Sequence, residues 1–340
     1  MNQNQDQWPA EQSGVPPLGQ NLPERSLEEP VQEALPKRII RSTFSQIGLG
    51  LFAMLAVQQV TSLLLIVLIR AVAPHLEDTG WFLWAVSYIP LYGISYPILL
   101  SIWRRVPNRM TLPYPTKKLP AYANPLLIAG CFAITYTLNL VSILVAQGIS
   151  LLTGSEIVNP LETALGSGNL WLNLIVVTIV APVMEEVIFR LFLYKKLACF
   201  GGRVYVFFSA LLFAAFHINI YQVLYAFVLG VVMAVVTYQT GSIRHSILLH
   251  MCINFLGGGG TPLILHYAGE IGSFVMSLSI VMILGVGIFA IVWWFRKGCL
   301  WMDFGVRRYH ISPTRMIILN PGVLLYLLLV FALTVLQIVI

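Results

Sequence analysis

The stretch "APVMEEVIFR", from Ala181 to Arg190, places two carboxylates and one guanidinium inside an apolar run that is long enough to cross a bilayer. The chain has 340 residues, of which 58% are hydrophobic and 10% are charged, and its mean hydropathy is +0.81. This composition excludes an ordinary soluble domain and predicts a polytopic membrane protein. Ionisable groups at membrane depth are costly, so each of them needs a partner or a function.

The pattern of apolar runs predicts an all-α membrane bundle of about nine transmembrane helices. A run of about 17 to 25 apolar residues suffices to cross the hydrocarbon core as a helix, and the fifth and seventh runs are shorter. We place the runs at Ile47–Val72, Trp81–Trp103, Asn124–Leu152, Leu170–Leu197, Val204–His217, Tyr221–Thr240, Ile243–Leu256, Ser273–Phe295 and Ile317–Ile340.

The net charge of +6 is carried by short basic clusters between the apolar runs. Such clusters are typical of loops that anchor membrane helices, and they speak against a nucleic-acid partner. With alternating spans the basic loops share one side, which the positive-inside rule assigns to the cytoplasm. We therefore expect a multi-pass protein of the cell membrane with a cytoplasmic N-terminus. The opposite loops carry mainly acids, namely Glu77, Asp78, Glu156, Glu162 and Glu270.

The two ends of the chain are expected to differ in order. Up to about Leu35 the sequence is rich in Pro, Gln and Glu and too poor in aliphatic residues to offset the entropy lost on ordering. We expect residues 1–40 to form a disordered cytoplasmic tail and residues 41–340 to form the transmembrane helical domain.

The acidic pair in the fourth run has two distinct expected roles. Glu186 and Arg190 are four residues apart, so they share one helix face and favour an ion pair. Glu185 lies about 100° around the helix from Glu186, so it is expected to remain available for another partner. One glutamate is therefore interpreted as structural and the other as free to act.

Two later runs carry histidines at membrane depth. His217 lies four residues after Phe213, and His250 lies four residues before Asn254. The second spacing directs an imidazole and a carboxamide toward the same space. Counted from the expected cytoplasmic ends at about 1.5 Å per residue, Glu185, His217 and His250 lie roughly 10 to 20 Å deep. These side chains can therefore surround one cavity.

A carboxylate, two imidazoles and an amide in a partly dry site can hydrolyse a peptide bond. Glu185 with His217 can take a proton from an attacking water. His250 with Asn254 can stabilise the oxyanion that forms. Glu185, His217 and His250 also make up the ligand set of a hydrolytic zinc site. Because the helical H-E-x-x-H signature is missing, the sequence leaves the zinc-dependent and the metal-free mechanism both open.

Each of these groups also has a structural interpretation. Glu186 with Arg190 fits an internal staple, and His217 fits an interfacial residue at a helix end. His250 with Asn254 fits an interhelical hydrogen-bond clamp. The same groups would also serve a transporter, an ion-coupled channel, or a non-catalytic immunity or scaffold protein.

Three motifs in this order resemble those of a known family. They are "EEVIFR" (Glu185–Arg190), "FAAFH" (Phe213–His217) and "HMCIN" (His250–Asn254). They match the Glu-Glu-x-x-x-Arg, Phe-x-x-x-His and His-x-x-x-Asn motifs of the CPBP or Abi family. That family comprises the type II CAAX prenyl endopeptidases and related bacterial proteins, and the resemblance covers roughly residues 165–257.

The resemblance implies an intramembrane endopeptidase that cuts a membrane-associated protein or peptide. It implies that Glu185 and His217 activate the attacking water, and that His250 and Asn254 stabilise the oxyanion. The family has also been described as metal-dependent, which would make the protein a metalloprotease with zinc at Glu185, His217 and His250. The resemblance does not assign a prenylated substrate. The supporting residues it implies are Glu186, Arg190 and Phe213.

Overall fold

The computed structural model describes residues 36–109, 123–167, 169–297, 317 and 319–339. Within these ranges every regular element is a helix and no strand occurs, so the expected all-α fold is confirmed. The expected disordered tail lies outside the described residues up to residue 35. The first helix, α1, begins at Lys37.

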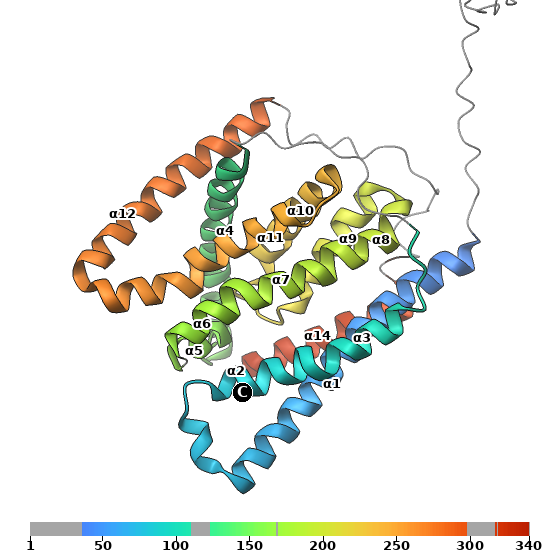
Figure 1. Ribbon diagram of the computed structural model, residues 1–340, viewed down its shortest axis with the longest axis horizontal. Helices are drawn as coiled ribbons and strands as arrows, with labels where there is room; N and C mark the ends of the chain where they lie inside the picture. Colours follow the sequence, from blue (N-terminus) through green and yellow to red (C-terminus); the bar gives the residue numbers. More distant parts are fainter. Residues whose placement is uncertain (1–35, 110–122, 168, 298–316, 318, 340) are drawn as a thin grey trace, which may run out of the picture. The chain divides into compact units, whose positions relative to one another are not determined.

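In the first part of the described chain, successive helical elements continue one another into long rods (Figure 1). Two of these rods, Phe82–Trp103 and Leu170–Phe200, contain segments of wider, π-helical backbone. The rod Leu170–Phe200 also carries the acidic motif. The elements up to that motif are α1 (Lys37–Val72), η1 (Pro74–Asp78), α2 (Phe82–Tyr88), η2 (Ile89–Ser95), α3 (Tyr96–Trp103), α4 (Ala123–Thr153), α5 (Pro160–Ser167), α6 (Leu170–Ile175), η3 (Val176–Val180) and α7 (Ala181–Glu186).

The second part of the described chain supplies the two histidine motifs. Its elements are η4 (Val187–Phe192), α8 (Leu193–Leu197), η5 (Ala198–Phe200), α9 (Gly202–Phe216), α10 (Val223–Thr240), α11 (Arg244–Asn254), η6 (Phe255–Gly259), α12 (Gly260–Lys297) and α14 (Pro321–Val339).

Seven helical segments of the described chain are long and apolar enough to cross a membrane, and Gly202–Phe216 is a shorter apolar helix. One of the seven, Arg244–Trp294, has 51 residues, which corresponds to about 77 Å, more than twice a hydrocarbon core of about 30 Å. Gly269 breaks this segment with φ 54° and ψ −137°, a backbone conformation that glycine adopts without steric cost. The membrane bundle is confirmed, whereas the count of nine spans stays a prediction.

Exposed aliphatic side chains cover the outward faces of the long helices. Leu63, Leu64 and Leu68 of α1 and Leu144 of α4 are each more than half exposed. Contiguous apolar surface of this kind is covered by lipid or by a partner. Together with the length of the helices, it identifies a multi-pass membrane protein.

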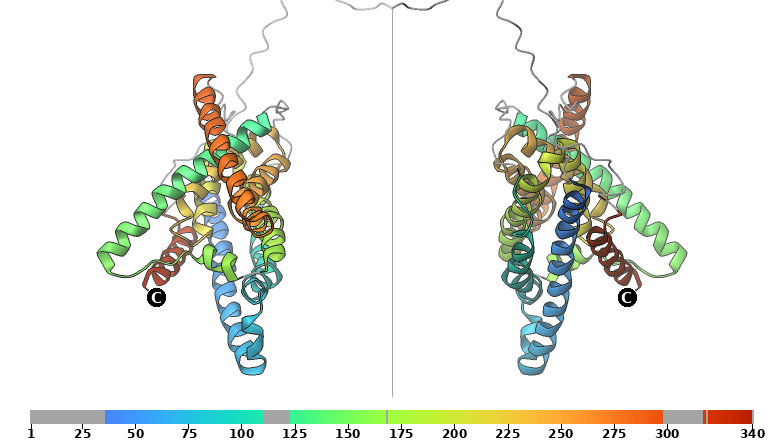
Figure 2. Two further views of the ribbon diagram at one scale, coloured as in Figure 1. Left: turned by 90° about the vertical axis from the view of Figure 1, so that its left-hand side faces the viewer. Right: turned by 90° about the vertical axis from the view of Figure 1, so that its right-hand side faces the viewer.

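Helices that are distant in the sequence pack against one another around the buried core. α1 packs against α3 and α14, α9 packs against α10, and α4 packs against α10, α11 and α12. Figure 2 shows the same helices from two further sides. The helix that carries the acidic motif contacts α11 through both α7 and η3, and this contact brings the first and third motifs together.

At Pro90, a side chain from a neighbouring helix makes the hydrogen bond that the proline cannot make. Pro90 lacks the N–H that would bond to the carbonyl of Val86 four residues earlier. The hydroxyl of Ser62 in α1 donates to that carbonyl instead, at 2.7 Å. A missing backbone donor in one helix is thus replaced by a side-chain donor from another, and the bond fixes α1 against α2.

α1 and α14 approach closely because both carry glycine at the contact. A Cβ at Gly48 would overlap the backbone of Gly322, and a Cβ at Gly322 would overlap the carbonyl of Ser45. Asn320, just before α14, donates through Nδ2 to the carbonyl of Arg41 at 2.7 Å. Small residues at this contact allow the two backbones to pack together, as is common between membrane helices.

We expect Gly322→Ala to destabilise the protein by about 1–3 kcal/mol, because the new methyl group forces α1 and α14 apart. The thermal unfolding midpoint in detergent measures this loss. Gly148→Ala in α4 is the matched control, since a Cβ there meets nothing within 4 Å and alanine favours the helix by about 1 kcal/mol. Equal midpoints for the two variants would contradict the close packing.

Candidate active site

An imidazole lies between two carboxylates where α7 meets α11. His250 Nδ1 lies 3.0 Å from Glu186 Oε1, and His250 Nε2 lies 3.7 Å from Glu185 Oε2. The first distance is a hydrogen bond, whereas the second is too long for one and allows both atoms to bind the same water. We call Glu185, Glu186, Arg190 and His250 the glutamate–histidine cluster.

The two neighbouring glutamates differ in their access to the site. The side chains of Glu186 and Arg190 are both 0% exposed, and Arg190 Nε lies 3.2 Å from Glu186 Oε2. The ion pair expected from their spacing is therefore observed. The side chain of Glu185 is 15% exposed, so this carboxylate is the one that water and a substrate can reach.

Phe213 connects the arginine to both histidines. The Arg190 guanidinium carbon lies 4.1 Å from the centroid of the Phe213 ring, in a cation–π contact. The rings of His217 and His250 meet Phe213 in T-shaped arrangements, with centroids 4.8 Å and 5.6 Å away. The phenylalanine of the second motif therefore sets the positions of groups from all three motifs.

α9 is fastened to the acidic motif through carbonyl groups of the π-helical segment η4. Ser209 Oγ donates to the carbonyl of Phe189 at 2.7 Å, and the Tyr205 hydroxyl donates to the carbonyl of Arg190 at 3.3 Å. Buried hydroxyl groups and carbonyls are costly unless they are paired. These bonds hold the second motif against the first.

His217 stands at the end of α9 with one ring nitrogen already engaged. Its Nδ1 lies 2.9 Å from the carbonyl of Phe213. This hydrogen bond leaves the other ring nitrogen, Nε2, available for a second partner. The Glu185 carboxylate is close enough to act electrostatically on His217. The next residue, Ile218, has φ 48°, a strained conformation for a β-branched residue that recurs at functional sites.

Asn254 reaches a carbonyl that a proline has left without a backbone donor. Ala181 N–H bonds to the carbonyl of Val176, five residues earlier. In the same pattern residue 182 would bond to Val177, but Pro182 has no N–H. Asn254 Nδ2 donates to the Val177 carbonyl at 2.9 Å. The third motif is therefore joined to the helix of the first motif at a second point.

Residues 167–256 match the family model described as type II CAAX prenyl endopeptidase Rce1-like. The chain carries an Rce1-like segment. The resemblance inferred from the three motifs is thereby shown for about a quarter of the chain. No curated protein and no solved structure matches the chain. The match supports an intramembrane protease in general terms.

Three tyrosines that the sequence patterns did not single out lie within electrostatic range of Glu185, and two of them are outside the Rce1-like segment. The charge of Glu185 acts on three tyrosine side chains, namely Tyr88 of α2, Tyr92 of η2 and Tyr225 of α10. The Tyr88 ring lies 5.5 Å from the rings of Trp84 and Tyr92. The spacing of four residues between these aromatics signals a shared helix face, but that face alone does not reveal its neighbour.

A hydrogen bond ties this aromatic face to the Rce1-like segment. Trp84 Nε1 donates to Asn173 Oδ1 at 2.7 Å, and Asn173 Nδ2 donates to the carbonyl of Leu165 at 2.9 Å. α2 is therefore held beside α6, the start of the helix that carries Glu185.

Among the described residues, no group of three or more His, Cys, Asp or Glu side chains is arranged to hold a metal ion. Glu185, His217 and His250, which would hold the ion in the zinc-dependent alternative, are not arranged as such a group there. Their geometry shows the Glu185 carboxylate 3.7 Å from His250 Nε2, with Nδ1 of both His217 and His250 engaged by other groups.

We expect Arg190→Met to destabilise the protein by about 3–5 kcal/mol, because it leaves the buried Glu186 carboxylate without its cationic partner. The thermal unfolding midpoint in detergent is the measurement. The double variant Glu186→Gln with Arg190→Met is the matched control, because it removes both charges and should lose less stability. A single variant as stable as the unaltered protein would contradict the pairing.

Proposed function

We propose that the protein is an intramembrane endopeptidase in which Glu185 activates the water that attacks the peptide bond. The observation that carries the proposal is the position of His250, whose Nδ1 is bound by Glu186 and whose Nε2 is directed to Glu185. This arrangement lies within the Rce1-like segment.

Glu185 is the base of the proposed mechanism because it is the accessible member of the acidic pair. The carboxylate takes a proton from water while His217, through its free Nε2, holds the same water in position. The apolar surroundings strengthen these charge interactions relative to bulk water. Glu185 then delivers the proton to the leaving amine.

His250 and Asn254 stabilise the oxyanion of the tetrahedral intermediate in this proposal. His250, held at Nδ1 by Glu186, donates Nε2–H to the oxyanion. Asn254 donates one amide hydrogen to Val177 and retains a second for the same oxygen. Both donors are fixed before the substrate arrives, which is the condition for efficient electrostatic stabilisation.

The substrate is a membrane-associated protein or peptide, as the lipid-facing helices and the Rce1-like segment support. The basic loops support a cytoplasmic N-terminus under the positive-inside rule. Tyr88 and Tyr92 lie within electrostatic range of Glu185, and in this proposal their rings contact the peptide there. Whether the substrate is prenylated is decided by a comparison of matched peptides.

We expect Glu185→Gln to lower kcat by about 100- to 10,000-fold, because the amide cannot accept the proton of water. Purified protein in detergent is incubated with a membrane-adjacent peptide in farnesylated and unmodified form, and products are identified by mass spectrometry. Glu162→Gln, at an exposed glutamate of α5, is the matched control and should retain full activity.

Asn254→Ala is expected to lower kcat by about 100- to 1,000-fold with little change in KM, since it removes an oxyanion donor. Pro182→Ala should act through the same residue, because the new backbone N–H competes with Asn254 for the Val177 carbonyl. We expect a smaller loss, about 10-fold, and no further loss when Pro182→Ala is added to Asn254→Ala. Fully additive losses would show that Pro182 does not act through Asn254.

Two outcomes would reject the protease mechanism. Unchanged cleavage in Glu185→Gln, His217→Ala and His250→Ala variants would remove the residues from catalysis. Solute uptake by proteoliposomes without any peptide cleavage would assign the same groups to a transporter. Metal analysis of active protein, with cleavage measured before and after chelation, separates a zinc-dependent from a glutamate–histidine mechanism.

A further inference from the structure

A basic pocket lies far from the glutamate–histidine cluster in sequence and is not used by the proposed mechanism. It has a volume of about 420 Å³ and lies between the start of α1 and the segment that follows α3. Its charged lining residues are Arg38, Arg105 and Arg109, and no acidic residue lines it among the described residues. Three like charges around one cavity repel one another unless an anion joins them.

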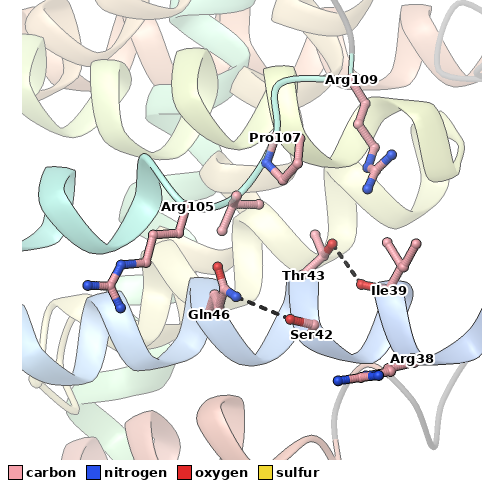
Figure 3. Close-up of a pocket in the computed structure, with 9 residues that line it drawn as sticks. Arg38, Ile39, Ser42, Thr43, Gln46, Arg105, Pro107 and Arg109 are labelled. Atoms are coloured by element: carbon pink, nitrogen blue, oxygen red, sulfur yellow. Dashed lines mark hydrogen bonds between the residues drawn. The ribbon is translucent and has the colours of Figure 1, made fainter.

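The pocket combines arginines with hydroxyl and amide groups. Figure 3 shows Arg105 and Arg109 extending from the segment after α3 toward α1, where Ser42 and Gln46 lie. The Nε atom of Arg109 is buried and has no hydrogen-bond partner among the described residues, and the same holds for Gln46 Oε1. An unpaired buried donor and an unpaired buried acceptor are both costly, so a ligand that satisfies them binds favourably.

The walls of this pocket are fixed by hydrogen bonds outside it. The buried Lys196 ammonium donates to the carbonyls of Trp103 and Val106, at 3.0 Å and 2.8 Å, and to Asn108 Oδ1 at 3.1 Å. Trp103 Nε1 donates to the carbonyl of Ile47 in α1 at 3.2 Å. The arginines are therefore carried by a segment that is already ordered, which lowers the entropic cost of binding.

The position of the pocket indicates that its ligand comes from the membrane. Arg38 to Gln46 precede the first apolar run, and Arg105 to Arg109 follow the end of the second run. Both segments therefore lie at the boundary between hydrocarbon and water, on the side rich in lysine and arginine. Phospholipid headgroups occupy this level of the bilayer.

We propose that the basic pocket binds the phosphate of an anionic phospholipid headgroup. Guanidinium groups match phosphate oxygens through paired, charge-assisted hydrogen bonds. A headgroup hydroxyl, as in phosphatidylglycerol, donates to Gln46 Oε1, while the acyl chains lie along the exposed apolar faces of α1. This binding does not depend on the proposed protease activity.

The test measures phosphatidylglycerol retained by the detergent-purified full-length protein, using native mass spectrometry. Arg105→Gln combined with Arg109→Gln should weaken retention by about ten-fold or more, because two charge-assisted contacts are lost. Arg104→Gln is the matched control, since Arg104 is exposed in the same turn and does not line the pocket. We expect less than about a two-fold change there.

A comparison of three ligands, which differ in headgroup or in acyl chains, identifies what the pocket binds. Phosphatidylglycerol should be retained, whereas zwitterionic phosphatidylcholine should not, and soluble glycerol phosphate should bind weakly because it lacks acyl chains. Equal retention of phosphatidylglycerol by the double variant and the unaltered protein would overturn the site. Tight binding of soluble glycerol phosphate would contradict the proposal that the ligand is a membrane lipid. An equal loss in Arg104→Gln would reduce the effect to general surface charge and overturn the proposal.

Discussion

The buried carboxylate of Glu186 is the constraint on which the candidate active site depends. Its two oxygens meet Arg190 from the same helix and His250 from α11. A charge without water around it is tolerated only with such partners, so both helices must keep one relative position. Phe213 of α9 then covers the guanidinium and contacts both histidines. The accessible Glu185 is placed beside His250 as a consequence.

Much of this arrangement could be predicted from the sequence, because helical spacing determines which side chains share a face. The ion pair of Glu186 with Arg190 and the shared direction of His250 and Asn254 follow from a spacing of four residues. Spacing does not reveal which helix faces which. The bond from Asn254 to Val177 and the tyrosines beside Glu185 therefore could not be predicted. The break at Gly269 is similarly a matter of backbone conformation, which composition does not encode.

The chain uses two different solutions for charged groups near the membrane. In the glutamate–histidine cluster, the buried Glu186 carboxylate is matched by two residues of the protein, Arg190 and His250. The basic pocket is open and lacks acidic lining residues among those described, so the negative charge that balances its arginines comes from outside the protein. The first solution lies within the Rce1-like segment. The second is built from α1 and the segment after α3, which lie outside it.

The proline at position 182 has a consequence for how the protein is made. The carbonyl left free at Val86 can be met by Ser62, which is synthesised earlier and is already in the bilayer. The carbonyl at Val177 and the carboxylate of Glu186 depend on Asn254 and His250, which emerge from the ribosome much later. A nascent chain that ends before α11 lacks both of these partners, so the candidate active site is complete only when biosynthesis has passed Asn254.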